Sequence, residues 1–80
     1  MRLLSCGIDV HYGNSNFHFI NEETKKECYR VIPTERTHIS DMLGEFNENR
    51  IQYAFETGTM ARFMYGVMKS NAPYSGNLHA

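Results

Sequence analysis

Two short stretches decide the fold: LSCGIDV at residues 4–10 and IQYAFE at residues 51–56. In both, large apolar side chains alternate with small or polar ones, which is the period of two of a β-strand with one buried face. Asp9 and Glu56 stand at or near the C-terminal ends of these runs, each on the face of the small or polar residues. If the strands lie side by side and parallel, both carboxylates project from one edge, where open α/β sheets bind ligands. Two acids that meet there repel unless a proton or a metal cation lies between them.

The bulk composition is that of one small globular domain. The chain has 80 residues, of which 41% are hydrophobic and 21% charged, and its formal net charge is −1. This charge argues against a strongly basic surface for gripping phosphates. No apolar stretch approaches the roughly 20 residues of a membrane helix, and we expect a cytoplasmic protein without membrane contact. Cys6 and Cys28 lie on separate predicted strands without CxxC spacing, so we expect buried free thiols.

The order of predicted elements is strand, strand, strand, helix, strand, helix. Strands are expected at residues 2–10, 16–20, 26–32 and 51–56, the third ending at a proline. Apolar residues at helical spacing predict helices over residues 35–46, with Thr34 as N-cap, and over residues 60–68. The sequence thus predicts a partial domain at residues 1–70 and an irregular tail at residues 71–80. The unit is incomplete, because the second helix should lead to a further parallel strand.

Two motifs carry a resemblance to a known family. The first is GIDVH at residues 7–11 and the second is ETGTMAR at residues 56–62. Together, each at the end of a predicted strand, they resemble the N-terminal RuvC-like domain of the DEDD insertion-sequence transposases, which are related to Piv-type DNA invertases. The resemblance extends over about residues 4–69.

This resemblance implies an α/β, ribonuclease H-like (RuvC-like) mixed sheet, truncated here after the fourth strand and second helix. It implies that Asp9 and Glu56 are catalytic, as the first two of four acidic ligands of a divalent metal pair, Mg²⁺ or Mn²⁺, in the complete enzyme. Such a pair activates a water or 3′-hydroxyl and stabilises the leaving oxygen during DNA strand cleavage and transfer. The partners implied are DNA, a guide RNA for the complete enzyme, and further copies of the chain in a homo-oligomer.

The chain also departs from the family pattern. The two remaining aspartates of the family lie well downstream, and the single other aspartate here, Asp41, falls on the first predicted helix and matches neither. The separate C-terminal domain with a catalytic serine has no counterpart in these residues. We therefore expect this chain to be catalytically inactive alone.

Three further residues are candidate contacts to nucleic acid: His11, Thr57 and Arg62. A histidine two residues beyond Asp9 could contact metal or phosphate, although a histidine at a strand end is more often a surface or hydrogen-bonded residue. The backbone N–H groups of residues 57–59 could bind a phosphate at the start of a helix, or simply form a turn. Arg62 could equally be a solvated helix residue, and both carboxylates could be exposed acids at strand ends.

Two other classes of function stay open. The GID motif followed by Gly13, Asn14 and Ser15 loosely resembles the first phosphate loop of the actin and sugar-kinase superfamily, in which the aspartate would hold Mg²⁺ near ATP phosphates. A non-catalytic, dimerising relic of a transposase is the third hypothesis, with a sheet edge and apolar helix faces as its interface.

Overall fold

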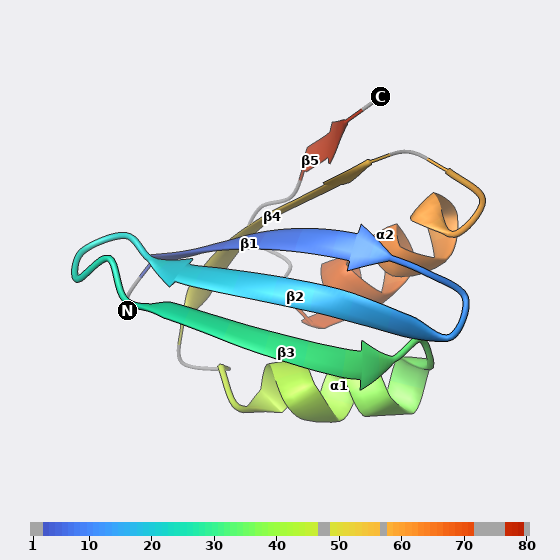
Figure 1. The fold of residues 1–80 in the computed structure, drawn as a ribbon, viewed down its shortest axis with the longest axis horizontal. Coiled ribbons are helices and arrows are strands. Elements are labelled where there is room, and N and C mark those ends of the chain that lie inside the picture. The colour runs from blue at the N-terminus through green and yellow to red at the C-terminus, as the bar shows by residue number, and fades with distance from the viewer. Residues whose placement is uncertain (1–2, 47–48, 57, 72–76, 80) are drawn as a thin grey trace.

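The computed structural model describes residues 3–46, 49–56, 58–71 and 77–79, with the backbone alone at Glu56 and at residues 77–79. The elements run in the order β1 (Leu3–Val10), β2 (Asn14–Asn21), β3 (Glu27–Pro33), α1 (Arg36–Gly44), β4 (Arg50–Glu56), α2 (Ala61–Asn71) and β5 (Asn77–His79). Figure 1 shows them as one mixed sheet with two helices. The predicted α/β class is confirmed. No described helix is long and apolar enough to span a membrane.

The strands form one sheet in the order β3-β2-β1-β4-β5. β1, β2 and β3 are a meander of antiparallel neighbours, whereas β4 lies parallel to β1 on its other side. The condition set for residues 4–10 and 51–56, that the two strands lie side by side and parallel, is therefore met. β3 and β4 also run parallel but are separated by β2 and β1, and the chain crosses from one to the other through α1.

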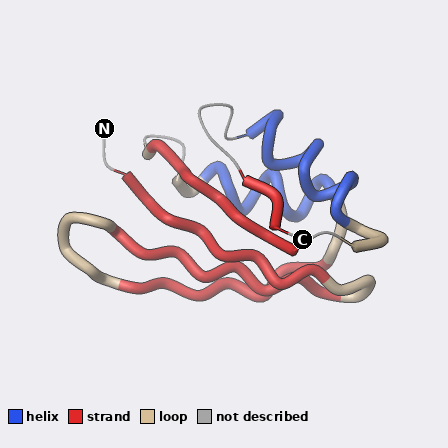
Figure 2. The backbone as a smooth tube through the Cα atoms, turned by 90° about the horizontal axis from the view of Figure 1, so that it is seen from above, coloured by secondary structure: helices blue, strands red, loops and turns tan. Residues whose placement is uncertain are grey.

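Both helices pack on the same face of the sheet, as Figure 2 shows from above. α1 contacts β3 and α2, and α2 also contacts β4. The side chains between the two layers follow the predicted strand and helix periods. The buried hydrophobic residues are Leu4, Cys6, Ile8, Phe17, Phe19, Ile39, Met42, Leu43, Ile51, Tyr53, Phe55, Met64, Val67 and Met68. The opposite sheet face has no helix over it among the described residues (Figure 2). Tyr29 and Val31 are exposed on that face, because their partners on β2, His18 and Asn16, alternate with the buried Phe17 and Phe19.

The structure corrects two predictions about element ends. Thr34 does not cap α1: Glu35 holds the N-cap position, without a side-chain hydrogen bond, and the Thr34 hydroxyl instead donates to the carbonyl of His11. The tail is not wholly irregular, because Asn77–His79 pairs with β4 as a parallel strand. The sheet consequently does not stop at its fourth strand, and β4-α2-β5 completes the parallel unit. The periodicity missed β5 because a three-residue strand is too short to establish an alternation.

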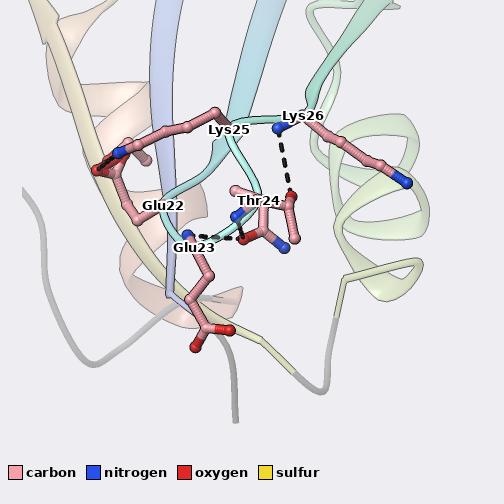
Figure 3. Close-up of polar contacts among 7 residues, drawn as sticks. Glu22, Glu23, Thr24, Lys25 and Lys26 are labelled. Carbon is pink, nitrogen blue, oxygen red and sulfur yellow. Dashed lines mark hydrogen bonds and ion pairs between the residues drawn. The ribbon is translucent and has the colours of Figure 1, made fainter.

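The turn between β2 and β3 is held by its own side chains (Figure 3). Asn21 Oδ1 accepts hydrogen bonds from the backbone N–H groups of Glu23 and Thr24, at 2.9 and 3.1 Å. Lys25 takes φ of 64°, the left-handed region that non-glycine residues seldom adopt. Its ammonium lies 3.7 Å from the Glu22 carboxylate, and that carboxylate also accepts a hydrogen bond from the Ser5 hydroxyl of β1.

Candidate functional site

The candidate site begins where β1 and β4 end. Their register pairs Gly7 with Ala54 and Ile8 with Phe55, so Asp9 and Glu56 are the next residues in the two neighbouring strands. Both strands point toward the end of the molecule at which α2 begins (Figure 1). Adjacent strands of a sheet are about 4.8 Å apart. The backbone therefore brings the positions of the two predicted acids together, as the sequence predicted, while the side chain of Glu56 lies outside the described residues.

Asp9 is an exposed carboxylate with one hydrogen-bond partner among the described side chains. Its Oδ2 atom lies 3.1 Å from Nε2 of His11, and the two side chains are 68% and 63% exposed. Exposure leaves the second carboxylate oxygen accessible to a ligand. The structure thus places His11 in direct contact with Asp9, where the imidazole orients the carboxylate at the strand end.

A cleft of about 540 Å³ opens beside Asp9. One wall is the end of β1 with the loop that follows it, residues 8–12, and the other is the start of α2 with the turn that precedes it, residues 58–61. The first turn of a helix leaves backbone N–H groups without intrahelical partners and carries a partial positive charge. The cleft thus joins an acidic strand end to a helix start, an arrangement that suits a cation together with an anionic group.

The loop after β1 is fixed to the end of β3. The Thr34 hydroxyl donates to the carbonyl of His11, and the Thr34 backbone N–H donates to the carbonyl of Gly13, at 3.0 Å. The buried Ser15 hydroxyl lies 2.8 Å from the Thr34 hydroxyl. Because the Thr34 hydrogen is used at His11, Ser15 donates in this contact. These three bonds hold the wall that carries His11.

The other predicted contacts differ in outcome. Arg62 is exposed on α2 and is not among the residues that line the cleft. Thr57 lies outside the described residues, whereas the neighbouring Gly58 and Thr59 line the cleft. Among the side chains that the structure describes, no group of three or more His, Cys, Asp or Glu residues is placed to hold a metal ion. Of the two predicted metal ligands, Asp9 and Glu56, the structure describes the side chain of Asp9 alone.

Sequence reasoning missed Tyr12. Its side chain is 74% exposed and lines the cleft next to His11. The available signal was a large aromatic residue in a loop directly after a predicted ligand, since loops that follow strand ends carry binding residues disproportionately often.

The two cysteines are free thiols, as expected, but only one of them is buried. Cys6 is buried in the core, and this burial raises the pKa of its thiol to about 12. Cys28 is only half-buried, and its sulfur accepts a hydrogen bond of 2.7 Å from the Arg30 guanidinium. The same guanidinium donates to Glu45, and this bond is the main cause that raises the pKa of Arg30. These groups lie away from the cleft and do not enter its chemistry.

Comparisons with known proteins add no family to this geometry. No family model matches the chain, and no curated protein is significantly similar to it.

Proposed function

We propose that this chain is the N-terminal part of a DEDD-type transposase or recombinase with a ribonuclease H-like fold, acting in metal-dependent DNA strand cleavage and transfer. The observation that supports the proposal most is the strand register, which makes Asp9 and Glu56 neighbours at the parallel ends of β1 and β4. The cleft beside Asp9 offers space for a phosphate at this point.

The donor set fits a hard divalent cation. Mg²⁺ prefers oxygen ligands and is commonly bound by one or two carboxylates, with waters and substrate phosphates in the other positions. Asp9 and Glu56 would hold it, and when bound it would supply charge stabilisation for the oxygens of the scissile phosphodiester. Asp9 is exposed enough to bind a cation, since its side chain is 68% exposed.

The residues around the carboxylates would serve the substrate rather than the metal. His11 orients the Asp9 carboxylate through its 3.1 Å contact. The start of α2, with the turn at residues 58–61, faces the cleft. The Ala61 N–H already donates to the Gly58 carbonyl at 3.1 Å, so a DNA phosphate would be attracted there by the partial positive charge of the helix start. Two carboxylates are only half of the four-acid set that the family resemblance implies, so the chain alone is expected to be inactive.

The test is a nicking assay with the gene product that contains this chain and the residues that follow it in the reading frame. Supercoiled plasmid carrying the DNA that flanks the gene is incubated with Mg²⁺ or with EDTA. Asp9→Asn and Glu56→Gln should each reduce nicking to background. Asp41→Asn is the matched control, since Asp41 is an exposed acid on α1, and it should leave nicking unchanged. Nicking that persists in EDTA or in Asp9→Asn would contradict the proposal.

An ATP-binding function is the second candidate, because Tyr12 in the loop after β1 lines the same cleft as Asp9. Titration with Mg²⁺-ATP separates the two, as saturable binding lost in Asp9→Asn would favour the nucleotide class.

A further inference from the structure

The sheet face opposite the helices has a regular arrangement of side chains. The pairing of the strands places Ala54, Gly7, His18 and Tyr29 in one row across β4, β1, β2 and β3. Two small residues therefore stand beside two ring side chains. One neighbouring row holds Gln52, Ser5, Ile20 and Glu27, and the other holds Asp9, Asn16 and Val31.

The two rings of this row are stacked. The His18 and Tyr29 ring centroids are 4.2 Å apart, with 4° between the ring planes. His18 Nε2 also lies 2.6 Å from Glu27 Oε1, which fixes the orientation of the imidazole. One face of the imidazole is covered by Tyr29, and the His18 side chain as a whole is 34% exposed. The stack therefore ends with the imidazole at the strand that carries Gly7.

Next to this end the sheet is hollow. Two depressions of about 420 and 380 Å³ meet over Gly7, and both are lined by Gly7 and His18. A Cβ atom added at Gly7 would meet no atom within 4 Å. Because neighbouring strands are about 4.8 Å apart, a planar group over Gly7 would continue the stack at nearly the spacing that separates His18 from Tyr29.

Polar side chains border the hollow on both sides. Asn16 and Asp9 flank one end, and Gln52 flanks the other. Among the described contacts, neither the Asn16 nor the Gln52 side-chain amide takes part in a hydrogen bond, so both are available to the edge of a ring. Amide groups that donate and accept are the side chains that pair with the edges of nucleobases.

We propose that the hollow over Gly7 binds a nucleobase of single-stranded DNA, stacked on the free face of the His18 ring. This inference rests on the proposed function, for which it supplies the path of the substrate strand. Asp9 belongs to both the hollow and the cleft at the strand ends. With a base held over Gly7, the DNA strand would run along the open sheet face toward the proposed metal site. Stacking of bases on aromatic side chains is a sequence-tolerant mode of single-strand binding.

The variants follow from the geometry. Gly7→Val fills the hollow, and valine is favoured in strands, so the fold should persist. His18→Leu removes the ring plane, whereas His18→Phe keeps a ring and loses only the bond to Glu27. Gly44→Ala is the matched control, a glycine at the end of α1 with equally open surroundings. Circular dichroism verifies that each variant is folded.

The experiment measures fluorescence anisotropy of labelled oligothymidylate of 12 nucleotides and of an abasic oligomer of equal length, at low salt. The wild-type chain should bind the thymidylate at least about tenfold more tightly, since one stacked base contributes on this scale. Gly7→Val and His18→Leu should reduce thymidylate binding to the abasic level, and His18→Phe and Gly44→Ala should not. In parallel, thymidine monophosphate should shift the His18 ring protons in the NMR spectrum upfield.

Two results would overturn the inference. Equal binding of both oligomers, unchanged by Gly7→Val, would mean that bases do not use the hollow, and Mn²⁺ binding would then test the proposed function separately. No binding of either oligomer and no shift of the His18 protons would also overturn it. In that case Mn²⁺ titration decides about the proposed function. Binding by wild type that is lost in Asp9→Asn would support it, and absence of binding by wild type would contradict it as well.

Discussion

Replacement of Cys6 by alanine should remove a strong dependence of stability on pH. Cys6 lies in the core between the sheet and the helices with 2% of its surface exposed, and burial raises the pKa of its thiol from 9.0 to about 12. The native state therefore keeps this proton in a pH range in which the unfolded chain releases it. Stability is fully present below pH 9 and is lost as the pH rises toward 12, because the unfolded state binds fewer protons there.

The size of the effect follows from the difference between the pKa values of the Cys6 thiol in the unfolded and native states. Each pH unit within it lowers the free energy of unfolding by about 1.4 kcal/mol, so wild type should lose about 2 kcal/mol between pH 8 and pH 10.5 from this group alone. The free energy of unfolding of an 80-residue domain is small, and a loss of this size is a large part of it.

The assay is urea unfolding followed by far-ultraviolet circular dichroism at pH 7.5, 9, 10 and 10.5, with a reductant present. Cys6→Ala should be less stable than wild type at pH 7.5, but its stability should fall less with pH. Burial also raises the pKa of Tyr53, which acts in the same direction and is the cross-strand partner of Cys6. Both proteins therefore carry Tyr53→Phe, so that the difference between them isolates Cys6. Equal pH slopes for the two proteins would refute the reasoning, since they would mean that Cys6 is solvated in the native state.

Three further predictions test the fold by urea unfolding. Lys25→Gly should stabilise the chain by about 0.5 kcal/mol, because glycine adopts the positive φ of this position without strain, whereas Lys26→Gly in the same turn should destabilise it. A loss of stability in Lys25→Gly would contradict the turn geometry. Thr34→Val should lower the free energy of unfolding by about 1–3 kcal/mol, since it leaves the buried Ser15 hydroxyl without its partner. Adding Ser15→Ala should recover part of this loss. Strictly additive effects of the two substitutions would mean that the two hydroxyls do not interact. Met64→Ala should lower the free energy of unfolding by about 2–5 kcal/mol, because the side chain is fully buried. A loss below about 1 kcal/mol would show that α2 does not pack on the sheet.

The sheet could be predicted from local patterns because the decisive strands are amphipathic. The alternation around Cys6 and Tyr53 identifies the buried face, and the same period places Asp9 on the other face. The parallel pairing of β1 with β4 was only a hypothesis from the sequence, because the local pattern of each strand does not specify its neighbour.

Other features depend on contacts that sequence spacing does not encode. Thr34 is an ordinary helix cap by residue type, but its hydroxyl is drawn to the His11 carbonyl and to Ser15, which the β1–β2 hairpin brings near. The stack of His18 on Tyr29 requires the cross-strand register, which a turn containing a positive φ at Lys25 sets. Tertiary context, rather than propensity, decided each of these positions.

The measurement that tests the central claim most directly is Mn²⁺ titration of the ¹⁵N-labelled chain, with paramagnetic broadening of the amide signals as the readout. The account predicts that signals from residues 8–11 and 55–60 broaden first. It also predicts that this selectivity is lost in Asp9→Asn and retained in Asp41→Asn. Broadening spread evenly over the exposed acids, or a pattern unchanged in Asp9→Asn, would contradict a metal site at the ends of β1 and β4.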